Sequence, residues 1–158
     1  MSLERKFKIF YSLIILLCLS SIFYAFFVEY ILGYKPCILC KYQRMPYILG
    51  LVLGLIGFIE TLNKRIIFFT FLTFLISMSL SGYHVGIEQE LYQSIFNCSD
   101  DNLSIFEEGK LLESLSVINP DCRNVNFAVF GVSLATINFI LSFVISLVSY
   151  YLYSNAKN

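Results

Sequence analysis

The sequence has no tryptophan, one histidine, three prolines and eight glycines among its 158 residues. The low glycine and proline contents exclude collagen-like and low-complexity chains. One histidine excludes a His-rich metal-binding tract, and it disfavours a haem-based electron carrier that needs paired histidine ligands. Eleven basic and eleven acidic residues give zero formal net charge. The chain therefore has no basic field that would attract nucleic acid.

Charged residues are also scarce. They make up 14% of the chain, and hydrophobic residues make up 58%, whereas a soluble domain averages about 25% charged and about 45–50% apolar residues. Too few polar side chains remain to coat a water-soluble globule of this size. We therefore predict a membrane protein, and the length is that of one domain.

Four apolar stretches meet or approach the roughly 20 residues that a helix needs to cross a bilayer. The predicted spans are roughly residues 9–32, 41–62, 66–85 and 127–152. The second is strictly apolar only from Met45 to Ile59, so Lys41 and Tyr42 would serve as interface residues. The expected fold is an all-α, antiparallel bundle of four transmembrane helices, with external loops at residues 33–40 and 87–126.

The basic residues Arg5, Lys6 and Lys8 before the first stretch resemble the start of a secretory signal peptide. The apolar run that follows is longer than the roughly 7–15 residues of a signal-peptide core, and no A-x-A-like cleavage site closes it. An uncleaved signal anchor is favoured over a cleaved signal on a three-helix protein.

Basic residues also predict the orientation. With four spans, both termini share a side with the turn at residues 63–65. The cations on that side are Arg5, Lys6, Lys8, Lys64, Arg65 and Lys157. The loop at residues 87–126 on the other side is acidic, so we predict that both termini are cytoplasmic. The cysteines then placed outside are Cys37, Cys40, Cys98 and Cys122, whereas Cys18 lies within the first span. External cysteines indicate disulfide chemistry.

The first external loop leads into the sequence GYKPCILCKYQRMPY, which contains a C-x-x-C at Cys37 and Cys40. Because the second span follows directly, Cys40 is expected near a helix N-terminus, where backbone N–H groups favour a thiolate. Arg44 lies one turn after Cys40 on the same face, where a guanidinium can hydrogen-bond a carbonyl oxygen. These features favour a redox-active pair. A structural disulfide, half of a zinc site and a purely topology-setting role for Arg44 remain alternatives.

The second external pair, Cys98 and Cys122, brackets residues 99–121, whose apolar residues recur at roughly helical spacing. We expect a short amphipathic segment on the membrane surface. A bridge that closes this loop is either open to attack by the thiolate of a partner or a simple staple. Two pairs in series suggest an electron relay, and a relay needs an acceptor. A pair at the edge of the bilayer indicates a lipid-soluble quinone.

The run PCILCKYQR resembles the P-C-x-L-C-x-x-Q-R signature of the bacterial DsbB/BdbC disulfide-bond formation proteins. The later YHVGIE at residues 83–88 is also similar, as are the four spans and the external cysteine pairs. The resemblance implies a protein of the bacterial cytoplasmic (inner) membrane that reoxidises a DsbA-like thioredoxin-fold oxidase. The electrons would pass to the membrane quinone pool, either ubiquinone or menaquinone, along the route that keeps the periplasm oxidising.

The same resemblance implies a role for each matching residue. Cys37 and Cys40 would be the quinone-linked pair, with Cys40 the sulfur that meets the quinone ring. Arg44 would contact the quinone. Cys98 would form the mixed disulfide with the oxidase, and Cys122 would be its partner in the outer pair.

Three further residues carry open interpretations. His84 is either a polar group near the quinone or an interface histidine that caps the third span. Gln43 is expected only to satisfy backbone groups at the helix start, and Cys18 to be a small hydrophobic residue. Because tryptophan is absent, any ring stacking near the quinone would use phenylalanine or tyrosine.

Two other classes of protein share some of these features. A tetraspanin-like scaffold with a disulfide-stapled outer loop would not need C-x-x-C at a helix start with arginine one turn later. An oxidoreductase of the vitamin K epoxide reductase type typically has its C-x-x-C after the loop cysteines, whereas here it comes first. A thiol:quinone oxidoreductase of the DsbB type is therefore the favoured function.

Overall fold

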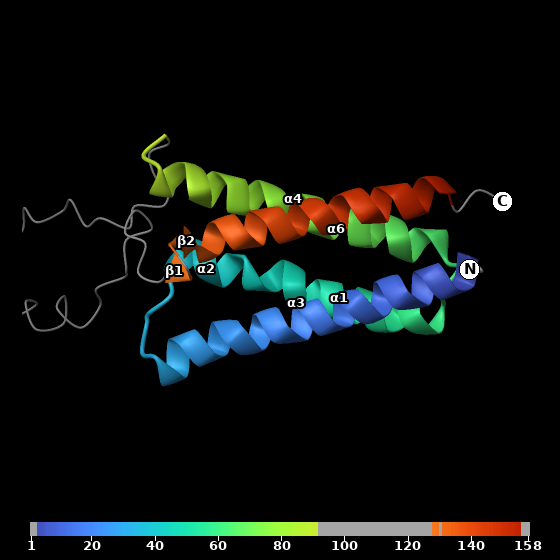
Figure 1. Ribbon diagram of the computed structural model, residues 1–158, viewed down its shortest axis with the longest axis horizontal. Coiled ribbons are helices and arrows are strands. Elements are labelled where there is room, and N and C mark those ends of the chain that lie inside the picture. Colours follow the sequence, from blue (N-terminus) through green and yellow to red (C-terminus); the bar gives the residue numbers. More distant parts are fainter. Residues whose placement is uncertain (1–2, 92–127, 130, 156–158) are drawn as a thin grey trace, which may run out of the picture.

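The structure is a computed structural model, which describes residues 3–91, 128–129 and 131–155. Its long elements are α1 (Leu3–Phe26), continued by the π-helical turn η1 (Phe27–Ile31), then α3 (Arg44–Ile59), α4 (Lys64–Glu88) and α6 (Leu134–Asn155). Its short elements are α2 (Ile38–Tyr42) and the strands β1 (Ala128–Val129) and β2 (Val132–Ser133). Figure 1 shows the long helices side by side in one bundle.

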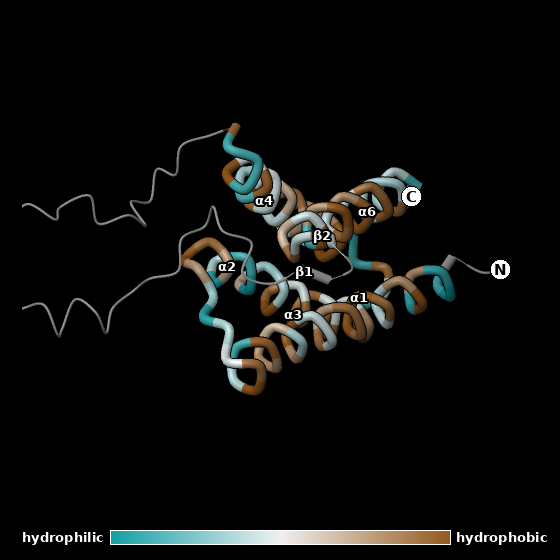
Figure 2. Tube along the Cα trace, turned by 60° about the vertical axis from the view of Figure 1, so that its left-hand side comes forward, coloured by the Kyte–Doolittle hydropathy of each residue, from teal (hydrophilic) through white to brown (hydrophobic). Residues whose placement is uncertain are grey.

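Four helical segments are long and apolar enough to cross a membrane, which confirms the all-α, four-helix fold class. They are Glu4–Ile31, Ile38–Ile59, Lys64–Glu88 and Leu134–Asn155. Figure 2 shows that hydrophobic residues dominate these helices, as expected for helices that face lipid.

The two ends of the bundle carry different elements. The N- and C-termini lie at one end, and α2 with the two strands lies at the other (Figure 1). α4 packs mainly against α6, α1 packs against α3, and the contact of α3 with α4 joins the two pairs. The side of the membrane on which the termini lie stays a prediction.

The second predicted span consists of two helical pieces. α2 ends at Tyr42 and α3 begins at Arg44, with Gln43 between them. Pro46 explains the break, because proline has no N–H to donate and its ring clashes with the carbonyl group four residues earlier, at Tyr42. The cysteine pair therefore lies on a separate short helix at the end of the bundle.

The predicted start of the fourth span was wrong. Helix α6 begins at Leu134, and the segment before it forms an antiparallel pair in which Ala128 lies opposite Ser133. Gly131 has a φ of +80°, a conformation that glycine adopts without a steric cost. This turn keeps residues 128–129 and 131–133 out of the helix that their apolar character predicts.

Glycines on α3 allow close approach of the neighbouring helices. Gly50, Gly54 and Gly57 are all buried. A Cβ atom at position 57 would lie 2.3 Å from a ring carbon of Tyr11 on α1, and one at position 50 would lie 2.9 Å from the ring of Phe74 on α4. Small residues at helix contacts are the usual means of tight packing in membranes.

We expect Gly57→Ala to destabilise the bundle by about 1–3 kcal/mol, because the added methyl group overpacks the contact with Tyr11. The measurement is the unfolding midpoint in a mild detergent. Gly82→Ala is the matched control, since its Cβ atom would meet Phe139 at 3.2 Å, and a smaller loss is expected. Equal losses in the two variants would contradict this explanation.

Candidate functional site

The cysteine pair lies at the start of α2. Cys37 is the N-cap residue, and its sulfur accepts a hydrogen bond from the backbone N–H of Cys40 at 3.4 Å. The two Sγ atoms are 3.0 Å apart, so a bridge of about 2.05 Å needs only a small movement of the sulfurs. The helix start was expected to favour a thiolate at Cys40, but this N–H group contacts the sulfur of Cys37.

His84 lies on α4, inside the bundle and against the pair. It is 3% exposed, and its Nε2 atom lies 3.7 Å from Cys37 Sγ and 3.7 Å from Glu88 Oε1. On the other side of the ring, Nδ1 lies 3.1 Å from Gln43 Nε2. His84 is therefore buried beside Cys37, which argues against an interface residue that only caps the span, and its role as a polar group near a quinone stays a prediction.

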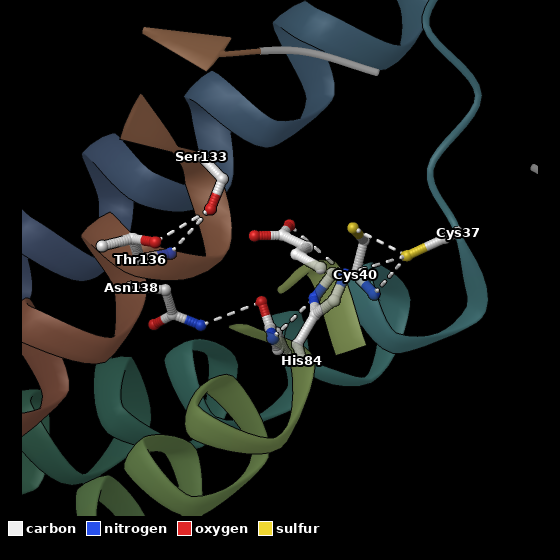
Figure 3. Close-up of polar contacts among 8 residues, drawn as sticks. Cys37, Cys40, His84, Ser133, Thr136 and Asn138 are labelled. Carbon is white, nitrogen blue, oxygen red and sulfur yellow. Dashed lines mark hydrogen bonds and ion pairs between the residues drawn. The ribbon is translucent and has the colours of Figure 1, made fainter. Parts of the chain in front are cut away.

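A buried chain of polar side chains continues from His84 toward α6. Asn138 Nδ2 donates to Gln43 Oε1 at 3.1 Å, and Asn138 Oδ1 accepts from the hydroxyl group of Tyr47. Figure 3 shows Asn138 on α6 and His84 on α4 at the two ends of this chain. The expectation that Gln43 serves only the backbone was wrong, because its side chain links two other helices. Sequence reasoning also missed Asn138, although an amide inside an apolar span is itself a signal of a functional site.

Arg44 is the first residue of α3, and its side chain contacts residues at the end of α1 and in η1. Its guanidinium forms an ion pair with the carboxylate of Glu29 and lies 5.3 Å from the ring centroid of Phe26, a cation–π geometry. The side chains of Arg44 and Glu29 are 20% and 22% exposed. Arg44 is therefore a partly buried, positioned cation.

A cavity joins these groups. It lies between the end of α1, the segment before α2, α3, α4 and the start of α6. Its polar lining includes Cys37, Cys40, Gln43, Arg44 and His84, and its apolar lining includes Ile22, Val28, Ala135, Ile137 and Leu141. The structure thus brings four of the predicted site residues to one cavity: Cys37, Cys40, Arg44 and His84.

The remaining predicted site residues, Cys98 and Cys122, lie outside the described residues, as does the expected amphipathic segment at 99–121. Cys18 is buried in the cluster of hydrophobic side chains that includes Tyr11 and Phe74, which is separate from the cluster around Cys37. This burial agrees with the interpretation of Cys18 as a small hydrophobic residue.

The fold and the site define a helical membrane protein with a C-x-x-C pair beside an apolar cavity. The family described as "Disulfide bond formation protein DsbB" matches residues 7–152, and the chain belongs to this family. Membership places it in disulfide bond formation as a multi-pass membrane protein and indicates an oxidoreductase, which confirms the resemblance read from the signature.

Several curated proteins are similar over most of their length. An uncharacterised protein of Rickettsia prowazekii (strain Madrid E) is 28% identical over 145 residues, which are 88% of this chain and 83% of the relative. The disulfide bond formation protein B of Xylella fastidiosa (strain 9a5c) is 27% identical over 128 residues, 75% of this chain and 73% of the relative. The protein of the same name from Polaromonas sp. (strain JS666) is 25% identical over 144 residues, 87% of this chain and 84% of the relative.

Proposed function

We propose that this protein is a protein-dithiol:quinone oxidoreductase. It would reoxidise a DsbA-like thioredoxin-fold oxidase and pass the electrons to the membrane quinone pool. The observation that carries the proposal is the contact of Cys37 with Cys40 at the wall of an apolar cavity that Arg44 also lines. Family membership supports the same chemistry.

The residues of the cavity fit a quinone. Binding sites for small molecules are mostly apolar with a few placed polar groups, and here aliphatic side chains from α1 and α6 supply the apolar walls. Arg44 can donate to a carbonyl oxygen, and Cys40 also lines the cavity. A quinone accepts two electrons and two protons, the same number that one dithiol releases when it forms a bridge. Ubiquinone and menaquinone both meet these requirements.

The outer cysteines complete the proposed relay. A thiolate of the reduced oxidase attacks the sulfur of Cys98 and breaks the Cys98–Cys122 bridge, and the second thiolate of the oxidase then closes its own disulfide. A thiolate of the reduced outer pair then attacks the sulfur of Cys37 and breaks the Cys37–Cys40 bridge, and the second outer thiolate closes the Cys98–Cys122 bridge again. Cys37 and Cys40 are left as a dithiol, and its return to a bridge would supply the two electrons and two protons that a bound quinone takes up. Each exchange forms one S–S bond and breaks one, so two electrons move inward at each step.

The proposed relay also implies in which membrane the protein lies and on which side its cysteines face. We place the protein in the bacterial cytoplasmic membrane, with both termini cytoplasmic and both cysteine pairs on the external side. The oxidase that supplies electrons works in an oxidising compartment, which in these cells lies outside that membrane.

The entry of electrons is tested by trapping the mixed disulfide. The Cys122→Ser variant of the full chain is incubated with an oxidised DsbA-like protein and run on a non-reducing gel. We expect a covalent complex that disappears in Cys98→Ser/Cys122→Ser and persists in Cys18→Ala/Cys122→Ser. A complex that forms equally without Cys98 would show that electrons enter elsewhere.

A thiophilic metal centre is the second candidate function. The sulfurs of Cys37 and Cys40 and a ring nitrogen of His84 all lie within 4.8 Å of one another, and Cys and His are the usual ligands of structural zinc. Metal analysis of the protein purified with reductant and without chelator separates the two functions. About one zinc per chain, lost in His84→Ala, would favour the metal centre, whereas the redox proposal expects no stoichiometric metal.

A further inference from the structure

The side-chain amides of Gln43 and Asn138 form a chain of hydrogen bonds with His84, in which each donor and acceptor fixes the next. Asn138 Oδ1 accepts from the hydroxyl groups of Tyr47 and Ser142, so its Nδ2 group donates to Gln43 Oε1. The oxygen of Gln43 is thereby occupied, and its Nε2 group faces His84 Nδ1 at 3.1 Å. An amide nitrogen can only donate, so Nδ1 has to accept and carries no proton.

The opposite side of the ring follows from this assignment. Nε2 faces the carboxyl group of Glu88 at 3.7 Å and the sulfur of Cys37 at 3.7 Å. A neutral imidazole has one N–H group, so a ring whose Nδ1 atom accepts from Gln43 carries its proton on Nε2, the atom that faces Cys37.

We propose that Gln43 and Asn138 are positioning residues that fix His84 as its Nε2–H tautomer, so that the imidazole donates toward the sulfur of Cys37 instead of accepting its proton. The backbone N–H of Cys40 already donates to that sulfur. In the reduced protein these two donors favour the thiolate of Cys37, since hydrogen bonds to the charged form stabilise it. Neither the tautomer nor this thiolate depends on the proposed function.

The tautomer is measured directly by nitrogen NMR. His84 is the only histidine in the chain, so ring-labelled protein without a polyhistidine tag gives the signals of one imidazole. In the wild type at neutral pH we expect Nδ1 in the unprotonated range and Nε2 in the protonated range. In Gln43→Glu we expect a protonated Nδ1, because a carboxylate at position 43 can only accept. A wild-type spectrum with Nδ1 protonated and Nε2 bare would overturn the proposal.

The consequence for Cys37 is measured by alkylation of the reduced protein, with the modified peptide identified by mass spectrometry. We expect Cys37 to be alkylated about tenfold more slowly at neutral pH in Gln43→Leu and in Asn138→Leu. Each substitution allows His84 to adopt the other tautomer, and this weakens the hydrogen bond from Nε2–H to the Cys37 thiolate. Thr70→Val is the matched control, because the Thr70 hydroxyl is buried on α4 and donates to the carbonyl of Ile66 in its own helix.

Unchanged alkylation in folded Gln43→Leu and Asn138→Leu would remove the positioning role. Because neither the spectra nor the alkylation requires a quinone or a donor protein, their failure is distinguishable from failure of the redox function. If the leucine variants do not fold, the spectrum of Gln43→Glu decides the question.

Discussion

Cys40→Ser is expected to abolish quinone-dependent oxidation of a reduced DsbA-like donor. The sulfur of Cys40 lies 3.0 Å from that of Cys37 and lines the cavity, and a serine hydroxyl cannot form the bridge that stores two electrons. The measurement is the anaerobic loss of donor thiols in the presence of a quinone. Turnover should fall to the rate seen without the protein.

Cys18→Ala provides the control for this variant. Cys18 is fully buried in the bundle core, in a hydrophobic cluster separate from that of Cys37, so its loss should leave turnover close to the wild-type rate. Quinone-dependent turnover that survives in Cys40→Ser would mean that the proposed order of the relay is wrong. A loss of turnover in both variants would indicate a general defect in folding.

The second large effect is expected for Arg44→Ala, which should raise the apparent KM for quinone. Removal of a charged hydrogen-bond donor typically costs about 1.5–3 kcal/mol, which corresponds to roughly a 10–100-fold weaker affinity. The partly buried guanidinium is held in place by Glu29 and lies over Phe26, so its position is fixed before any ligand arrives. Steady-state kinetics against quinone concentration measure the change.

Two further variants isolate the role of Arg44. Arg65→Ala removes an equal charge at the start of α4 and should leave KM unchanged, because Arg65 is exposed and lies outside the cavity lining. Arg44→Ala also leaves the carboxylate of Glu29 without its partner, so the double variant Arg44→Ala/Glu29→Gln removes that second effect. A KM that returns to normal in the double variant would show that Arg44 acts only by neutralising Glu29.

The sequence predicts the broad architecture because bilayer thickness imposes a length that apolar stretches reveal. It also predicts the local part of the site, since Cys37, Cys40 and Arg44 lie within two helical turns of one another. The break in the second span and the start of the fourth were not predicted, although the residues that cause them are visible in the sequence. Pro46 interrupts the second span, and Gly131 turns the backbone before the fourth.

The long-range part of the site could not be predicted. Gln43 meets His84 across 41 positions of the sequence and Asn138 across 95. Such partners depend on how the four helices pack and rotate against one another, which apolar length does not specify. Polar residues inside apolar spans are nevertheless unusual. Asn138 could therefore have been singled out from the sequence, whereas its contact with Gln43 could not.

The relay itself is tested most directly by anaerobic quinone reduction with the full-length protein in detergent or vesicles. Reduced DsbA-like protein is the donor, ubiquinone and menaquinone are supplied in separate reactions, and quinol is compared between the wild type and Cys98→Ser. The proposed relay predicts one quinol per donor dithiol oxidised in the wild type, with at least one of the two quinones, and none in Cys98→Ser. If the wild type holds both bridges intact and yet forms no quinol from either quinone, the relay is contradicted and the stapled scaffold becomes the better account.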